Sequence, residues 1–249
     1  MQLQGKTALV TGAASGFGAE IARRYVQEGA RVSILDLNGE GAKKVAQECG
    51  SAAMAFTADV TKLVDVESAV RESVAAFDRL DIVVNNAGWT HRNKSLLEVT
   101  EVEFDRVFSV NIKSIYLMTN LVVPIMQRHG GGSIINIGST AGVRPRPGLT
   151  WYNATKGAVN TLSKSMAVEL APMKIRVNCL APVLGETGLL EAFMGVPDTP
   201  ENRAKFVATI PLGRLSRPAD VANACVYLGS DAAEFITGVI LPVDGGRTV

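Results

Sequence analysis

A glycine-rich stretch near the N-terminus, Thr11 to Gly18, lies between a short apolar run and a helical pattern. Residues 7–10 before it are apolar enough for a buried strand, and residues 19–28 after it repeat apolar side chains at helical spacing. Glycines in such a turn let the backbone bend tightly and leave N–H groups free at the positive end of the helix. The stretch therefore predicts a strand–turn–helix unit that can hold a phosphate group.

A second strand pattern, residues 31–36, supports a more specific interpretation of this turn. It ends in an acid, Asp36, about 20 residues beyond Gly18, and dinucleotide-binding folds place a carboxylate on the adenosine ribose at that distance. The alternative, an ordinary glycine-rich turn, would not require this acid. We therefore expect a dinucleotide site, with Gly12, Gly16 and Gly18 in the phosphate-binding turn.

Composition narrows the class of protein. The 249 residues suffice for one large α/β domain or two small ones, and 47% hydrophobic residues allow a sizeable core. A net charge of +1 creates no field that would attract nucleic acid or an anionic membrane, so we expect neither partner. Cys49, Cys179 and Cys225 lack metal-binding spacing and only two histidines are present, which predicts reduced structural thiols and no metal site.

The sequence shows no sign of a targeting or membrane segment. Residues 1–6 lead directly into the first strand without a cleavable apolar segment. The most apolar stretch elsewhere, Leu117 to Met126, is too short to span a bilayer and contains Pro124. These features predict a cytoplasmic protein.

Strand and helix patterns alternate along nearly the whole chain. This alternation predicts an α/β fold, a single Rossmann domain over residues 1–249, with a seven-stranded parallel sheet and helices on both faces. The expected strands are residues 6–11, 31–36, 52–57, 80–85, 132–139, 174–181 and 238–243. The expected helices are residues 16–28, 39–49, 63–77, 101–129, 151–171 and 218–229.

One connection, residues 185–211, is long for a compact domain and rich in glycine and proline. Long ordered connections are often lids over a site, so we expect a substrate lid here. Its apolar side chains, among them Leu189, Leu190, Phe193 and Met194, could form a pocket wall or pack on the protein itself.

Tyr152 and Lys156 are four positions apart in a helical pattern, which places them on one face of the helix. A tyrosine has an ordinary pKa of about 10. A neighbouring ammonium and an oxidised nicotinamide would both lower that pKa, so that Tyr152 could exchange a proton with an alcohol. A functionless pair on the helix surface is the alternative. Ser139, at the end of the fifth strand, could hold the substrate oxygen beside the phenol.

Several motifs together resemble the short-chain dehydrogenase/reductase family, and more narrowly its classical branch. They are residues 11–18, Asp59-Val60, Asn85-Asn-Ala-Gly88, Asn111, Ser139 and Tyr152-Asn-Ala-Thr-Lys156, and the resemblance runs from Lys6 to Gly246. It implies a catalytic tetrad. In it, Tyr152 is the general acid/base, Ser139 orients the substrate oxygen, Lys156 binds the nicotinamide ribose and lowers the pKa of the tyrosine, and Asn111 holds a water.

The resemblance also implies how the cofactor is bound. Asp59 and Val60 would face the adenine, and Thr187 would contact the nicotinamide carboxamide. One departure concerns the loop after the sixth strand, where the family commonly has Pro-Gly and this chain has Pro182-Val183, so that a glycine-only backbone conformation should be lost. The expected cofactor-binding residues are Gly12, Ser15, Gly16, Phe17, Gly18, Asp36, Leu37, Asp59, Val60, Asn86, Ala87, Gly88, Tyr152, Lys156, Pro182 and Thr187.

Asp36 favours NAD over NADP. Its carboxylate can accept two hydrogen bonds from the ribose diol but would repel a 2′-phosphate. Members of the family that prefer NADP usually carry a basic residue at one of the places held here by Ser15 and Leu37. We therefore expect NAD as the cofactor.

Two loops should reach the substrate pocket. Residues 143–149 join Ser139 to Tyr152, and residues 89–94 follow the fourth strand. Their basic side chains could favour an anionic substrate group, or could be ordinary loop charges facing water. The candidate substrate-binding residues are Ser139, His91, Arg144, Arg146, Trp151 and Phe193.

These features predict an NAD-dependent oxidoreductase that interconverts a secondary alcohol, polyol or aromatic alcohol with its carbonyl compound. The lid resembles those of sugar dehydrogenases and of aromatic-aldehyde dehydrogenases of the formylbenzenesulfonate type. A 3-oxoacyl-(acyl-carrier-protein) reductase is the alternative, and a non-catalytic dinucleotide-binding protein is a more remote one, which loss of a tetrad residue would favour.

The chain is also expected to form a homotetramer. The helices that carry Val102, Phe104 and Val107 and, later, Ala158, Leu162 and Met166 have more apolar positions than one sheet contact needs. The last strand, residues 238–243, is an apolar edge strand that calls for cover. A tetramer with a pair of two-fold axes would bury both the helices and the strand. The family resemblance also favours a tetramer. The alternative is a dimer that uses the helices alone.

Overall fold

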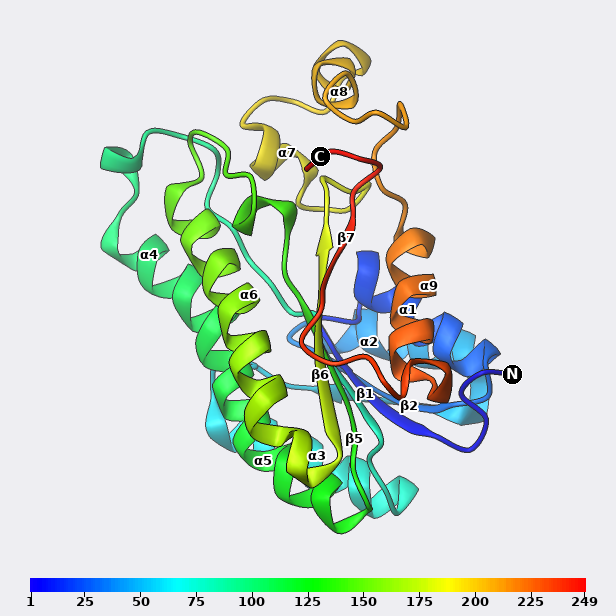
Figure 1. Ribbon diagram of the computed structural model, residues 1–249. Coiled ribbons are helices and arrows are strands. Elements are labelled where there is room, and N and C mark those ends of the chain that lie inside the picture. The colour runs from blue at the N-terminus through cyan, green and yellow to red at the C-terminus, as the bar shows by residue number, and fades with distance from the viewer.

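A seven-stranded parallel sheet forms the centre of the molecule in the computed structural model, which describes all 249 residues (Figure 1). Its strands are β1 (Thr7–Thr11), β2 (Arg31–Asp36), β3 (Ala53–Thr57), β4 (Ile82–Asn85), β5 (Gly132–Ile137), β6 (Ile175–Pro182) and β7 (Ile240–Val243). Their order is β3-β2-β1-β4-β5-β6-β7, so the direction in which strands are added reverses between β1 and β4. Open parallel sheets bind ligands at such a reversal point.

Helices cover both faces of this sheet, as the alternating sequence pattern predicted. One face carries α1 (Gly16–Gln27), α2 (Gly39–Cys49) and α9 (Pro218–Gly229), and the other carries α3 (Leu63–Phe77), α5 (Ser114–Arg128) and α6 (Thr150–Leu170) (Figure 1). Successive side chains of β1 point to opposite faces: Ala8 and Val10 lie in the first core and Leu9 in the second. Both faces of the central strands are therefore buried, which explains their continuous apolar sequences.

The helix expected at residues 101–129 is divided into three parts. A π-helical segment, Ser109–Lys113, separates α4 (Glu101–Phe108) from α5, and the buried Asn111 lies in this segment. By length and composition the whole stretch Glu101–Arg128 is long and apolar enough to cross a membrane, which the shorter run 117–126 did not suggest. Met118 and Val122 of this stretch are buried against the sheet, and core helices pass the same test.

The connection at 185–211 contains two helices that the sequence pattern did not predict, α7 (Leu190–Met194) and α8 (Pro200–Val207). Leu190 and Met194 are buried in a small core of their own together with Val183, directly after β6. Val183 does not have a positive φ, so the valine at the usual glycine position adopts an ordinary backbone conformation. Its side chain instead anchors this segment, which lies above the ends of the strands in Figure 1.

Candidate active site

A cavity of about 430 Å³ opens at the carboxyl ends of the strands, where the strand order reverses. It is lined by residues that follow β1, β2, β4, β5 and β6, together with residues of α6 and of the segment after β6. Every expected cofactor-binding residue except Gly18 lines it. The fold thus brings together side chains that are far apart in the sequence.

Glycines in the turn between β1 and α1 create the space for a ligand and for the neighbouring strand. Gly12 and Gly16 have positive φ values of 63° and 55°, and a Cβ at Gly12 would lie 2.8 Å from the Cα of Ala87. Gly18 does not line the cavity, and a Cβ there would collide with the carbonyl oxygen of Gly12. Gly18 was expected among the cofactor-binding residues, but the structure gives it the packing role of the third glycine: it lets the helix lie close to the turn.

The first turn of α1 is suited to an anion. Ser15, the residue before the helix, makes no capping bond with its side chain, and the first turn contains no acid. The backbone N–H groups of this first turn therefore remain free for a ligand at the positive end of the helix. A pyrophosphate fits this arrangement, since Gly16 and Phe17 line the cavity at the same place.

Asp36 is the last residue of β2 and lines the same half of the cavity as the turn between β1 and α1. Its carboxylate accepts hydrogen bonds from the backbone N–H groups of Ala14, at 2.9 Å, and Asn38, at 2.8 Å. These two bonds hold the carboxylate beside the phosphate-binding turn. Leu37 next to it is exposed and offers no positive charge.

Asn86 holds the turn to the end of β4. Its side-chain amide donates hydrogen bonds to the carbonyl oxygens of Thr11, at 2.8 Å, and Gly12, at 2.9 Å. The neighbouring Asn85 is buried and donates to Asn136 on β5 at 2.8 Å. The polar sequence after β4 is therefore explained by bonds that fix the cavity wall, in addition to any contact with a ligand.

Tyr152 and Lys156 project from α6 into the other half of the cavity, as their helical spacing predicted. Ser139, two residues after the end of β5, lines the same region and interacts with the phenol of Tyr152. Lys156 donates a hydrogen bond from Nζ to the carbonyl oxygen of Ile137 at 2.8 Å, and its Nζ lies 5.7 Å from the centre of the tyrosine ring. The three side chains thus surround one end of the cavity.

Asn111 does not line the cavity but is tied to its walls. Its amide nitrogen donates to the carbonyl oxygen of Trp89 and to Thr155 Oγ1, at 3.0 and 2.9 Å, and its oxygen accepts from the Trp89 N–H at 2.9 Å. Asn111 Oδ1 and Lys156 Nζ both lie 3.7 Å from the position that a Cβ would take at Gly88. The structure therefore places Asn111 close to Lys156 without a direct bond between them.

The pKa of the tyrosine differs from the sequence-based expectation. Burial raises the pKa of Tyr152 to about 12, although the Ser139 hydroxyl acts in the opposite direction. Burial also lowers the pKa of Lys156 to about 8. Desolvation therefore dominates the pKa of Tyr152 here, and Lys156 is bonded to a backbone carbonyl. The lowering expected from Lys156 together with an oxidised nicotinamide stays a prediction.

Of the six candidate substrate residues, Ser139 and two others line the cavity and three do not. Arg146 and Phe193 line the cavity, and the Phe193 ring packs edge-on against Tyr152 with ring centres 5.0 Å apart. The other three do not line it. His91 is buried and bonds the carbonyl oxygen of Arg92, Arg144 donates to the carbonyl oxygen of Arg247, and Trp151 packs on Phe104.

Two further cavity residues are Trp89 and Arg106. Trp89 begins the loop 89–94, which was expected to reach the pocket, although Trp89 itself was not among the candidate substrate residues. Arg106 lies on α4 and stacks over the Trp89 ring, 4.4 Å from its centre. No sequence pattern near Arg106 indicated that it would reach the cavity.

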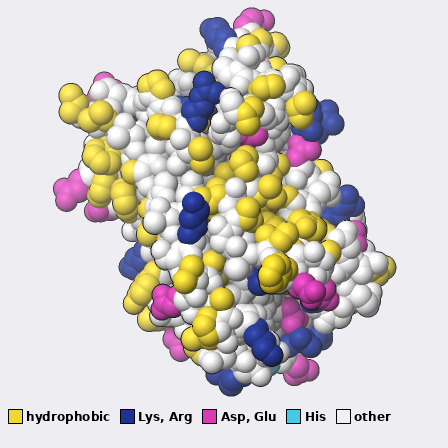
Figure 2. Space-filling view, viewed as in Figure 1, with side chains coloured by type: hydrophobic (Ala, Val, Ile, Leu, Met, Phe, Trp, Pro, Cys, Tyr) yellow, Lys and Arg dark blue, Asp and Glu magenta, His cyan; other side chains and the backbone are white.

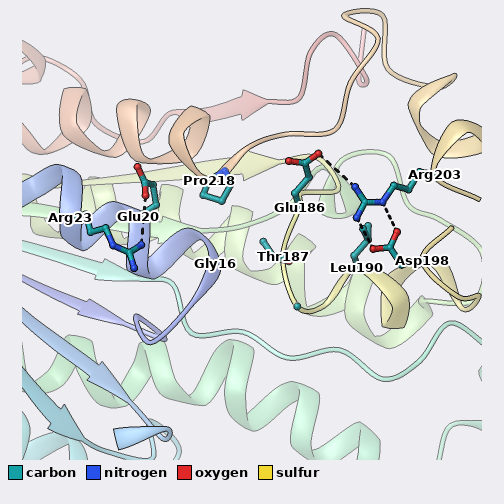
Figure 3. A pocket seen from close by; sticks show the side chains of 10 residues that line it. Gly16, Glu20, Arg23, Glu186, Thr187, Leu190, Asp198, Arg203 and Pro218 are labelled. Atoms are coloured by element: carbon teal, nitrogen blue, oxygen red, sulfur yellow. Dashed lines mark hydrogen bonds and ion pairs between the residues drawn. The ribbon is translucent and has the colours of Figure 1, made fainter. Parts of the chain in front are cut away.

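A second hollow, of about 440 Å³, lies between α1 and the segment after β6 (Figure 3). Its basic side chains are already paired with acids. Arg203 binds Asp198 at 2.6 Å and lies 3.8 Å from Glu186, and Arg23 lies 3.7 Å from Glu20 (Figure 3). This hollow therefore offers no free cation to a ligand, and the chemistry belongs to the cavity that Ser139, Tyr152 and Lys156 line.

The sheet order and the cavity at its reversal point define a protein of the Rossmann class. A family model described as enoyl-(acyl carrier protein) reductase matches residues 12–248. The chain is 50% identical over 252 residues to a 4-formylbenzenesulfonate dehydrogenase of Comamonas testosteroni and 36% identical over 253 residues to a 3-oxoacyl-(acyl-carrier-protein) reductase of Thermotoga maritima, with 100% of every chain covered. The chain therefore belongs to the short-chain dehydrogenase/reductase family of oxidoreductases.

A solved structure agrees with this assignment. The 3-ketoacyl-(acyl-carrier-protein) reductase from Brucella melitensis, complexed with NADH, is 47% identical to this chain. It superposes with a TM-score of 0.95 and covers 99% of this chain and 100% of its own.

Proposed function

We propose that this protein is an NAD-dependent oxidoreductase that interconverts an alcohol and its carbonyl compound. The observation that carries the proposal is the convergence of Tyr152, Ser139 and Lys156 at one end of a cavity whose other end holds a phosphate-binding turn and Asp36. The NADH in the Brucella melitensis reductase supports the choice of cofactor. Asp36 supports NAD over NADP because no basic residue beside it would offset a 2′-phosphate.

Each part of the cofactor has fitting residues. The free N–H groups at the start of α1 would bind the pyrophosphate, Asp36 the adenosine ribose, and Lys156 the nicotinamide ribose. Asp59 and Val60 would complete the site at the adenine, and Thr187 would complete it at the nicotinamide. When bound, NAD supplies the acceptor for the hydride that leaves the alcohol carbon.

Tyr152 would exchange the proton. In alcohol oxidation its phenolate accepts the hydroxyl proton, and in carbonyl reduction its phenol donates that proton back. Ser139 would hold the substrate oxygen beside the phenol by a hydrogen bond. The positive charges of Lys156 and of an oxidised nicotinamide would both favour the phenolate.

A 3-oxoacyl-(acyl-carrier-protein) reductase is the second candidate function, and the names of two relatives favour it. The 50% identity to the 4-formylbenzenesulfonate dehydrogenase favours a small aromatic substrate instead. A non-catalytic dinucleotide-binding protein has less support, because all four proposed catalytic residues are present around the cavity.

A panel of substrates separates these functions. The purified protein would be given NAD or NADP with aromatic alcohols, polyols and 3-hydroxyacyl thioesters, and NAD(P)H formation would be followed by absorbance. We expect turnover with NAD to exceed turnover with NADP, and aromatic alcohols to exceed thioesters. Binding of NADH without turnover of any substrate would indicate the non-catalytic alternative, and absence of NADH binding would overturn the proposal.

We also propose that the protein is a homotetramer. β7 is an edge strand, and Figure 2 shows hydrophobic side chains gathered near the centre of the face on which β7 lies. Val102 on α4 and Val168 on α6 are exposed, whereas Val107, which was expected to contribute to a contact, is buried within the subunit. Light scattering tests this: the mass of one 26.3 kDa subunit would refute any oligomer, and twice that mass would leave only the helix contact.

A further inference from the structure

The charged residues that line the cavity are unevenly distributed. The acids, Asp36 and Asp59, follow β2 and β3, at the end proposed for the adenosine. Arg106 and Arg146 line the cavity together with Tyr152 and Phe193, at the opposite end. Neither arginine takes part in any ion pair of the structure. The end of the cavity proposed for the substrate therefore carries positive charge without a compensating carboxylate.

Arg146 is the more enclosed of the two. It is half-buried and its guanidinium lies over the ring of Phe206 on α8, with its central carbon 5.2 Å from the ring centre. Its backbone carbonyl accepts a bond from Asn153, but its guanidinium makes no hydrogen bond to the protein. Burial lowers its pKa, and the nearby Arg247 lowers it further. A partly desolvated cation that repels its neighbour would be stabilised by an anion from outside the chain.

Aromatic side chains surround the same end of the cavity. Trp89, Tyr152 and Phe193 come from the loop after β4, from α6 and from α7, and all three line the cavity. Leu149, at the end of the loop that carries Arg146, adds an apolar contact. Flat apolar walls of this kind favour an aromatic ring over a hydrated polyol.

We propose that Arg146 binds a carboxylate or sulfonate group on an aromatic substrate whose reacting carbon faces Tyr152 and Ser139. A guanidinium can bind such a group through two parallel hydrogen bonds. These bonds fix the orientation of the ring, and the positive charge of the guanidinium compensates the negative charge of the group. The inference rests on the proposed function and specifies its substrate class: a benzylic alcohol, or the corresponding aldehyde, with an anionic group on the ring. Arg106, which is exposed and stacked on Trp89, adds charge at the entrance.

Kinetics with matched alcohols test this assignment. The substrates are 4-(hydroxymethyl)benzenesulfonate, 4-(hydroxymethyl)benzoate and the neutral 4-methylbenzyl alcohol, and the measured quantity is the ratio of kcat/KM for an anionic substrate to that for the neutral one. In each oxidation the carbinol carbon loses a hydride to NAD and the hydroxyl loses its proton to Tyr152. We expect this ratio to be about 10 to 100 in the wild type and close to one in Arg146→Gln.

Two further variants make the comparison specific. Arg146→Lys keeps the charge but loses the paired hydrogen bonds, so it should give an intermediate ratio. Arg144→Gln is the matched control, because Arg144 lies in the same loop but bonds a backbone carbonyl outside the cavity. An Arg146→Gln variant with the wild-type ratio, or an Arg144→Gln variant with the same loss, would overturn the assignment. A loss confined to 3-hydroxyacyl phosphopantetheine thioesters would do so as well, and would indicate a carrier phosphate as the anion.

Binding of a non-reacting anion separates this inference from the proposed function. 4-Methylbenzenesulfonate would be titrated into the protein by calorimetry, with and without NADH. We expect binding that is at least about tenfold weaker in Arg146→Gln than in Arg144→Gln. If the wild type binds this anion through Arg146 but oxidises no alcohol, the proposed function fails and the anion site stands. If it oxidises alcohols but the anion binds equally well to both variants, the anion site fails alone.

Discussion

The two ends of the cavity are built in different ways. At the end proposed for the adenosine and pyrophosphate, the walls are the turns that directly follow β1, β2 and β4, and most of their polar contacts involve the backbone. At the end proposed for the substrate, three separate segments meet above the sheet: residues 89–94, 143–149 and 189–195. The sheet itself fixes the first end, whereas the second depends on contacts between loops.

One side chain, Asn93, connects these three segments. Its amide nitrogen donates to the carbonyl oxygens of Pro147 and Phe193, at 3.1 and 3.4 Å, and its backbone N–H donates to the carbonyl oxygen of Ala192 at 2.9 Å. Gly195 has a positive φ, and a Cβ there would lie 3.0 Å from the Cβ of Asn93. Substrate choice in this chain can therefore change through loop residues while the cofactor end stays as the sheet positions it.

The largest effect is expected at the point where the two ends meet. Tyr152→Phe removes the transferable proton with little change of shape, so kcat should fall by about 10²- to 10⁴-fold while NADH binding is retained. Turnover and fluorescence titration of NADH measure the two quantities. Tyr116→Phe is the control, because Tyr116 is 65% exposed on α5 and should keep the wild-type rate. A Tyr152→Phe variant with more than half of the wild-type rate would refute the assignment.

A change at Asp36 should affect the cofactor end alone. Asp36→Ala removes the bonds proposed for the ribose, so NAD should bind about 10- to 100-fold more weakly. Asp36→Asn keeps an acceptor for the backbone N–H of Ala14, but it replaces the second carboxylate oxygen with an NH2 donor and removes the charge. Its main effect should be better binding of NADP. The preference is measured as kcat/KM with each cofactor. If both variants kept the wild-type preference, discrimination would have to come from another residue.

Lys156 gives the site a predicted pH dependence. Burial lowers its pKa from 10.5 to about 8, so its ammonium is present below that pH and is lost above it. Since the proposed role of Lys156 requires the charge, kcat/KM for NADH in carbonyl reduction should fall above pH 8 by up to about tenfold per pH unit. In Lys156→Arg the guanidinium stays charged, and the fall above pH 8 should disappear even if the rate is lower. A wild-type profile that is flat up to pH 10 would contradict this role.

The difference between the two ends also explains what the sequence could predict. Strand and helix positions and the cofactor-lining residues follow local rules: buried strands are continuous apolar runs, and a glycine turn before a helix holds phosphate. Loops obey no comparable periodicity. His91 and Arg144 were candidates as basic residues of loops expected to reach the pocket, and Trp151 as an apolar residue at the start of α6. A bond or a packing contact directs each of them away from the cavity.

Other differences have physical causes that act only in the folded protein. α7 and α8 have short apolar faces that are stabilised by the small core around Val183, which no local pattern reveals. The pKa of Tyr152 is set by its burial, and burial of a side chain on a helix depends on what covers it. Arg106 lies on α4 and lines the cavity through its stacking over Trp89, a contact between segments that the local sequence does not reveal.

The smallest effect is expected for a change in the loops, and it tests most directly whether the substrate end and the cofactor end are independent. Asn93→Ala removes two side-chain hydrogen bonds but keeps the backbone bond to Ala192. Since a single bond of this kind contributes about 0.5–1.5 kcal/mol, the substrate KM should rise by about 3- to 10-fold while the affinity for NADH stays unchanged. Asn202→Ala is the control, because it removes a side-chain bond to the carbonyl oxygen of Pro197 within the connection 185–211 but outside the cavity. Equal losses of substrate and NADH affinity in Asn93→Ala would show that the two ends are not independent.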